Sequence, residues 1–194
     1  YIMIKYPNGK IKVTLQTNVH SASNRGMELE SEINRSNEYY LNHKIAVIHK
    51  KPTPIQIVKV DYPKRSAAKI TEAYFRQAST TDYNGIYRGK YIDFEAKESK
   101  NKTVFPLKLI HPHQIRHLKE ILYHGGIGFF IIRWVSLEET YLVPAEKMIH
   151  FYQITTRSSI PHHWFEETGY LIQGNYVNPI DYLKIVNQLY FEKR

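Results

Sequence analysis

The sequence contains no cysteine, which excludes disulfide bridges and thiolate metal sites. It also lacks a long apolar run, because the longest, GIGFFIIRWV at 126–135, is about half the ~20 residues that a membrane-spanning helix needs. The first residues, YIMIKYPNGKIKV, lack the continuous apolar stretch of a secretory leader. We therefore expect a soluble, cytoplasmic protein that does not associate with membranes.

Acid is scarce: 18 Asp and Glu residues stand against 27 Lys and Arg, a net charge of +9. A basic balance favours a polyanionic partner such as nucleic acid, although some basic proteins of this size bind anionic membranes instead. The length of 194 residues fits one domain with a well-buried core. Residues 1–24 contain no acid at all, so we expect a basic, mobile N-terminal arm followed by a single domain at 25–194.

The hydrophobic pattern predicts alternating helices and strands. Helices are expected at 28–42, 112–124 and 178–191, the last with Asn178 as its N-cap and Pro179 in its first turn. Runs rich in β-branched residues predict strands at 45–49, 55–61, 128–135 and 140–145. Residues 62–77 fit either an exposed ribbon or a surface helix. This order of elements predicts an α/β fold, with a mixed central sheet flanked by helices.

The scarce acid is concentrated in one segment of the chain. In YIDFEAK, residues 91–97, apolar residues alternate with Asp93, Glu95 and Lys97. Because a strand has a period of two residues, one of its faces is apolar and the other carries three charges. A further acid, Asp82, lies a short distance upstream.

An Arg-Gly pair at 88–89 offers a two-residue hairpin turn, and a hairpin closed there places Asp82 opposite Glu95. An Asn-Gly pair at 84–85 is an alternative signal, for a bulge. Two carboxylates that face each other at about 5 Å repel unless a positive charge lies between them. Lys97 is one candidate, and Mg²⁺, which prefers oxygen ligands, is a better one. The alternative is a solvated outer face.

Asp82 followed by Glu95-Ala96-Lys97 resembles the PD-(D/E)xK nuclease motif, with Thr81 in the place of its proline. The sequence around the motif indicates a particular family more specifically than the motif does. It is similar to RecU-type Holliday junction resolvases from residue 24 to about residue 152, in the stretches IAVIHKKPTPIQIVKVDYPKRSAAKITEAYF, STTDYNG, YIDFEAKESKNKT and FPL.

The resemblance implies a restriction-endonuclease-like fold with a projecting basic stalk at about residues 60–78. It implies a homodimer that cleaves four-way DNA junctions symmetrically in recombination and repair. The implied cofactor is Mg²⁺, or Mn²⁺ in its place, and the RecA recombinase is a further implied partner. The implied metal ligands are Thr80, Asp82, Glu95 and Gln114.

In this family pattern Asp82, Glu95 and Lys97 are the catalytic residues, and Lys97 stabilises the transition state. Thr81 is the alternative to Thr80 as a ligand. Phosphate contacts are expected from the basic residues in and beside the stalk, where Tyr62, Tyr74 and Phe75 either stack on bases or pack at the stalk base. These basic residues are Lys59, Lys64, Arg65, Lys69 and Arg76.

Three other features keep alternatives open. Glu30 or Glu32 on the first helix could hold a second ion, although acid in a first turn also simply complements the helix dipole. His113 and His117 have helical spacing, but without a third ligand we expect solvated or phosphate-facing positions. The rival function is a non-catalytic junction-binding protein that modulates a recombinase, and a cell-wall regulatory factor is a third.

Overall fold

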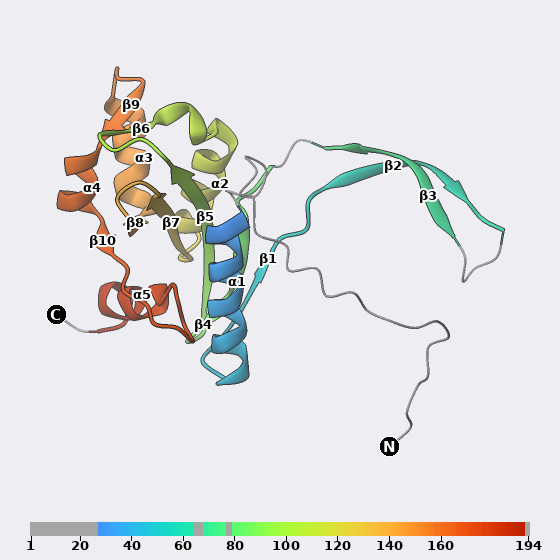
Figure 1. The fold of residues 1–194 in the computed structure, drawn as a ribbon, viewed down its shortest axis with the longest axis horizontal. Coiled ribbons are helices and arrows are strands. Elements are labelled where there is room, and N and C mark those ends of the chain that lie inside the picture. Colours follow the sequence, from blue (N-terminus) through green and yellow to red (C-terminus); the bar gives the residue numbers. More distant parts are fainter. Residues whose placement is uncertain (1–26, 64–67, 77–78, 193–194) are drawn as a thin grey trace, which may run out of the picture.

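The computed structural model describes residues 27–63, 68–76 and 79–192, so the expected N-terminal arm lies outside the described part. A six-stranded sheet with the order β1-β4-β5-β7-β8-β10 forms the centre (Figure 1). Its strands are β1 (Ala46–Lys50), β4 (Tyr83–Tyr87), β5 (Lys90–Ser99), β7 (Ile127–Trp134), β8 (Glu139–Pro144) and β10 (Tyr170–Leu171). β5 and β7 are parallel and the other neighbours are antiparallel.

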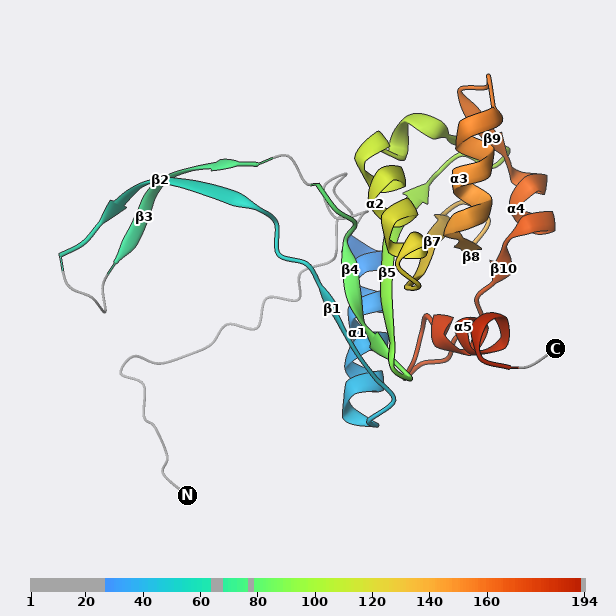
Figure 2. The same ribbon diagram turned by 180° about the vertical axis from the view of Figure 1, so that it is seen from behind.

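Helices cover both faces of this sheet (Figures 1 and 2). The helices are α1 (Met27–Asn42), α2 (Pro112–Tyr123), α3 (Ala145–Ile154), α4 (His162–Thr168) and α5 (Tyr182–Tyr190). Phe94 and Phe129 face a core built with α1 and α5, whereas Phe130 and Ile132 face a core built with α2 and α3. The predicted class, a mixed sheet flanked by helices, is therefore confirmed.

The β4–β5 hairpin has the predicted register. Tyr87 pairs with Lys90 and Tyr83 with Phe94, with no register shift between them. Arg88 and Gly89 both have positive φ, 49° and 78°, as a two-residue turn with the twist of the flanking strands requires. The alternative of a bulge at the Asn-Gly pair is therefore wrong.

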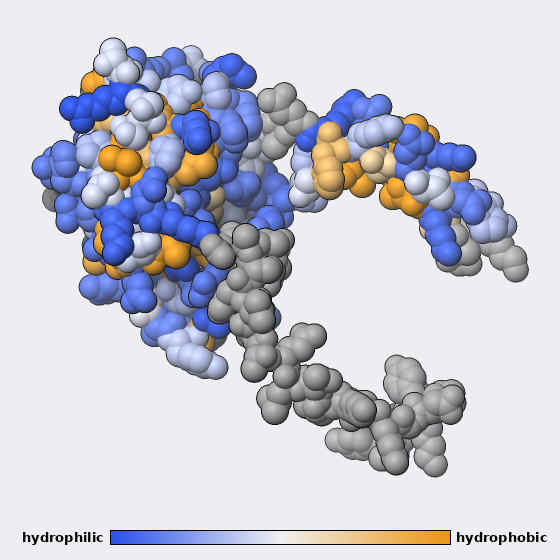
Figure 3. All heavy atoms as spheres, turned by 45° about the horizontal axis from the view of Figure 1, so that its top comes forward, coloured by the Kyte–Doolittle hydropathy of each residue, from blue (hydrophilic) through white to orange (hydrophobic). Residues whose placement is uncertain are grey.

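A separate two-stranded ribbon projects from the domain (Figures 1 and 2). It consists of β2 (Ile55–Asp61) and β3 (Lys69–Phe75), and we call it the stalk ribbon. All residues of both strands are exposed, and apolar side chains lie along it (Figure 3). Residues 69–75, within the stretch that fits either a ribbon or a surface helix, form a strand of this ribbon and not a helix.

Other expectations need correction. The last helix begins at Tyr182, with Asp181 at its N-cap, and not at Asn178. The Asn175 side chain accepts hydrogen bonds from the backbone amides of Val177 and Asn178, so these residues form a turn before the helix. The hydrophobic pattern also did not indicate several short elements: α3, α4, β10, β6 (Val104–Pro106), η3 (Leu107–Leu109) and β9 (Ser159–Pro161).

Candidate active site

Asp82 and Glu95 lie at the open end of the β4–β5 hairpin. Tyr83 and Phe94 form the last paired positions of the ladder, so Asp82 and Glu95 occupy the next opposed positions. The backbone amide of Lys51, just after β1, donates a hydrogen bond of 2.7 Å to the carbonyl of Asp82 and so holds the open end of the hairpin against β1. Three neighbouring strands therefore determine where the two acids meet.

Glu95 is a fully buried acid with an unusual environment. Burial raises the pKa of Glu95 to about 8; Lys97 lowers this pKa in part, and the nearby Asp82 raises it further. Lys97 Nζ forms a 2.5 Å ion pair with Glu95 Oε1, and Glu95 Oε2 has no hydrogen-bond donor among the described residues. A buried carboxylate beside a second one, with the Lys97 ammonium against only one of its oxygens, leaves negative charge that a divalent cation would neutralise.

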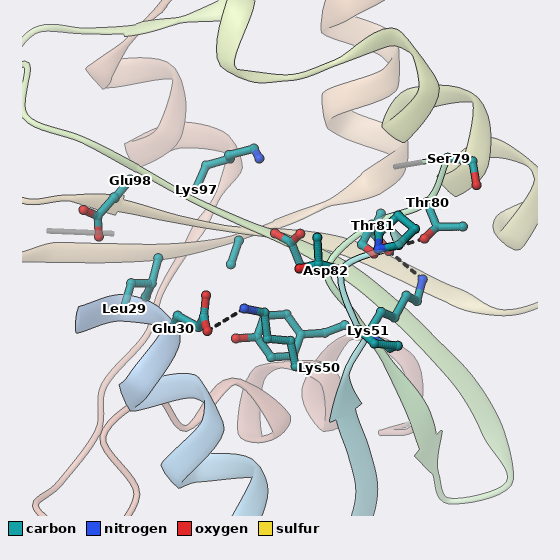
Figure 4. A pocket seen from close by; sticks show the side chains of 15 residues that line it. Leu29, Glu30, Lys50, Lys51, Ser79, Thr80, Thr81, Asp82, Lys97 and Glu98 are labelled. Carbon is teal, nitrogen blue, oxygen red and sulfur yellow. Dashed lines mark hydrogen bonds and ion pairs between the residues drawn. The ribbon is translucent and has the colours of Figure 1, made fainter. Parts of the chain in front are cut away.

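A cavity of about 560 Å³ opens beside this pair, between α1, the end of β1 and the β4–β5 hairpin (Figure 4). Thr80, Asp82 and Lys97 line it together. Glu30 lines it from α1 and forms a 2.5 Å ion pair with Lys50. The cavity is thus bordered by carboxylates and by lysines, which suits a cation together with a phosphate.

The other two predicted metal ligands, Thr80 and Gln114, have less direct positions relative to the Asp82–Glu95 pair. Thr80 is partly exposed, and its hydroxyl donates only a 3.3 Å hydrogen bond, to the carbonyl of Thr81. Gln114 is buried near the start of α2, and its Oε1 accepts a 2.9 Å hydrogen bond from the amide of His111. Of the four predicted ligands, Thr80 and Asp82 line the cavity, whereas Glu95 and Gln114 do not. The assignment of these ligands stays a prediction.

Sequence reasoning gave no role to Asp93, yet the structure makes it the most heavily contacted acid near the site. It is fully buried on β5. Lys51, Tyr91 and His117 contact its Oδ2 at 2.7, 2.9 and 3.1 Å, and the hydroxyl of Thr81 donates to its Oδ1. The alternation in YIDFEAK did indicate that Asp93 and Glu95 share a face, but a solvated face was the alternative that we kept open.

The helical histidines also differ from the expectation of solvated or phosphate-facing positions. His117 contacts Asp93, and His113 has a buried Nε2 without a hydrogen-bond partner. Burial, followed by the nearby positive groups, lowers the pKa of His113. Of the two candidate acids on α1, Glu30 lines the cavity, whereas Glu32 forms a 2.5 Å ion pair with Arg133.

The predicted DNA-contacting residues are spread along the stalk ribbon. Lys59, Lys69 and Arg76 are exposed there, whereas the predicted contacts Lys64 and Arg65 lie outside the described residues. Tyr62, Tyr74 and Phe75 are 67%, 60% and 82% exposed, so packing at the stalk base is not what the structure shows. Exposed aromatic rings next to cations are available to stack on bases.

Two searches of the described residues gave negative results. Among the described residues, no three His, Cys, Asp or Glu side chains come close enough together to hold a metal ion. Among the helices of the described ranges, none has the length and apolar character needed to cross a membrane.

Comparison with known proteins decides the family. The family model for RecU, described as "Recombination protein U", matches residues 24–188. The chain belongs to this family. The resemblance inferred from the motifs, including a weaker one in DYLKIVNQLYF at 181–191, is thereby confirmed, and the match also covers the residues between 152 and α5.

Curated relatives match over nearly the whole chain. The Holliday junction resolvase RecU of Geobacillus sp. (strain WCH70) is 55% identical over 199 residues, which cover 98% of this chain and 99% of the relative. The protein of the same name from Oceanobacillus iheyensis is 54% identical and covers 97% of this chain and 100% of its own. A solved structure, Archaeoglobus fulgidus Hjc, a Holliday junction resolvase, matches with a TM-score of 0.43 and 9% identity, covering 77% of this chain and 94% of that chain.

Proposed function

We propose that this protein is a Holliday junction resolvase, an Mg²⁺-dependent endonuclease that cleaves four-way DNA junctions in recombination and repair. Two observations support the proposal. Relatives named Holliday junction resolvase RecU are 52–55% identical over nearly the full length. Glu95 is a fully buried carboxylate beside Asp82, with the Lys97 amine 2.5 Å from one of its oxygens. The second carries the chemistry, because a phosphodiesterase of this kind needs a buried seat for a divalent cation.

Asp82 and Glu95 would hold the ion, with Thr80 and Gln114 as the further ligands, and Mn²⁺ is an acceptable substitute because it also prefers oxygen. When bound, the ion would supply positive charge that activates water and neutralises charge developing on the phosphate. Lys97, whose amine lies 2.5 Å from Glu95, offers a mobile point charge to the phosphate oxygens. The burial of Glu95 strengthens each of these interactions, since the local dielectric is low.

The stalk ribbon would hold the junction through its cations, Lys59, Lys69 and Arg76, which are exposed along both strands and just beyond. Symmetric cleavage of a four-way junction requires two active sites related by a two-fold axis, so we propose a homodimer. A cytoplasmic location and an interaction with the RecA recombinase complete the proposal.

The test compares the wild type with Glu95→Ala on a mobile four-way junction, with and without Mg²⁺. Glu95→Ala should bind the junction with unchanged affinity and lose cleavage by a factor of at least about 10³, because it removes the buried carboxylate. Glu167→Ala, an exposed acid on α4, is the control and should cleave normally. Normal cleavage by Glu95→Ala would exclude this site. A wild type that binds junctions in Mg²⁺ or Mn²⁺ without cutting them would instead favour the non-catalytic junction-binding protein.

A further inference from the structure

Asp93 is a buried carboxylate that the proposed ligand set does not use. It lies on β5, on the same face as Glu95, and is fully buried. A buried carboxylate is costly unless donors surround it, and this one has donors from three separate parts of the fold besides its own strand. Lys51 follows β1, Thr81 precedes β4 and His117 lies on α2.

The first set of contacts fixes the segment that carries the predicted ligands. Thr81 lies between Thr80 and Asp82, and its hydroxyl donates to Asp93. Lys51 Nζ donates to the same hydroxyl at 3.0 Å and to Asp93 at 2.7 Å, closing a triangle of three side chains. The Thr81 hydroxyl donates its only proton in the hydrogen bond to Asp93 and accepts a hydrogen bond from Lys51, so most of its hydrogen-bonding capacity is already used. Thr80 is therefore the better candidate ligand.

The second contact fixes α2. His117 Nε2 lies 3.1 Å from Asp93 Oδ2, and His117 is one helical turn after Gln114. Asp93 is in turn two residues before Glu95 on the same strand face. One carboxylate thus connects the strand that carries Glu95, the segment that carries Thr80 and Asp82, and the helix that carries Gln114.

We propose that Asp93, with Lys51, Thr81 and His117, is a positioning unit that sets the distance between the divalent-cation ligands without touching cation or DNA. The inference rests on the proposed function, because it takes the ligand set from it. Side chains that orient metal ligands without touching the metal typically change metal affinity or activity by about 10- to 100-fold when they are removed. Loss of this unit should therefore weaken Mg²⁺ binding and slow cleavage while leaving the grip on junction DNA intact.

Two substitutions probe the unit with little change in shape. Asp93→Asn removes the charge that holds Lys51, and Thr81→Val removes the hydroxyl. Each should raise the Mg²⁺ concentration that gives half-maximal thermal stabilisation by about 10-fold or more, and slow single-turnover cleavage by at least a similar factor. Junction affinity in a chelator should stay within about 2-fold, because phosphate contacts on the stalk determine it. Thr81→Ser keeps the hydroxyl and should restore Mg²⁺ affinity to within about 3-fold of the wild type.

A carboxylate with the same kinds of partner, but about one third exposed and not lining the cavity, offers a control. Glu139 on β8 also has a tyrosine two residues away and a histidine from a helix as partners: Tyr141 at 3.0 Å and His162 at 2.7 Å. Glu139→Gln should change the melting temperature without changing the Mg²⁺ half-point. A merely structural role for Asp93 predicts the same behaviour for Asp93→Asn.

Unchanged Mg²⁺ half-points in both Asp93→Asn and Thr81→Val would overturn the positioning unit, as would an equal loss in Thr81→Ser and Thr81→Val. An equal shift in Glu139→Gln would overturn it too, because the effect would then follow general destabilisation. If the wild type binds Mg²⁺ but does not cleave junctions, the proposed function fails, and the half-points still decide the role of Asp93. The thermal-shift measurement thus separates the two failures.

Discussion

Without a divalent cation, the free energy of unfolding should fall as pH rises from about 5 to about 8, and Glu95 should be a main cause. Burial raises its pKa from 4.5 to about 8 in the folded protein. A group whose folded pKa is raised contributes its full stability below the unfolded pKa and loses it as pH rises through the folded pKa. Across about pH 5 to 8.5, this displacement corresponds to a loss of about 4 kcal/mol.

Glu95→Gln isolates this contribution, because glutamine keeps the shape but does not titrate. We expect urea unfolding in a chelator to show the wild type and Glu95→Gln with similar stability near pH 5, since both side chains are then neutral. Near pH 8.5 the variant should be the more stable of the two, by up to about 4 kcal/mol. All other titratable groups are shared by the two proteins, so the difference between the two curves isolates position 95.

Glu167→Gln is the control, because Glu167 is exposed on α4 and should show no such divergence. Saturating Mg²⁺ should stabilise the wild type at high pH far more than it stabilises Glu95→Gln, since the cation binds the charged carboxylate. Parallel stability curves for the wild type and Glu95→Gln across this pH range would refute the reasoning. They would mean that Glu95 is ionised in the folded protein even without a cation.

Two further predictions concern the stalk ribbon and the sheet. Lys59→Ala combined with Lys69→Ala should weaken junction binding. Titrations at several salt concentrations should also give a log–log slope of affinity against salt that is shallower by about 1 per phosphate contact removed. An unchanged slope would exclude these lysines as phosphate contacts. Gly85→Ala should destabilise strongly, by about 3 kcal/mol or more, because a Cβ there would lie 2.1 Å from the carbonyl oxygen of Val47. Gly89→Ala meets no atom within 4 Å and should cost only about 1 kcal/mol for its positive φ, so equal losses in thermal unfolding would contradict this account.

The hairpin could be predicted from the sequence because its signals are local. The Arg-Gly pair has the conformation that its turn requires, and strict alternation then fixes which residues oppose each other. The C-terminal helix shows the limit of such signals. Asn178 and Pro179 have the composition of a helix start, but the side chain of Asn175 holds the preceding residues in a turn. A local competitor for backbone amides therefore delayed the helix.

The environment of the charged face of β5 could not be predicted from the local sequence in the same way. Alternation placed Asp93 and Glu95 on one side of β5, but whether that side meets water depends on α2, whose position is a matter of tertiary packing. The sequence shows His117 only as one of several histidines on a helix, and nothing local pairs it with an acid on a strand. Several side chains contact Asp93, whereas Glu95 has Lys97 against one oxygen and a second carboxylate, Asp82, nearby. Under the proposed function, the first acid positions the ligands and the second binds the cation.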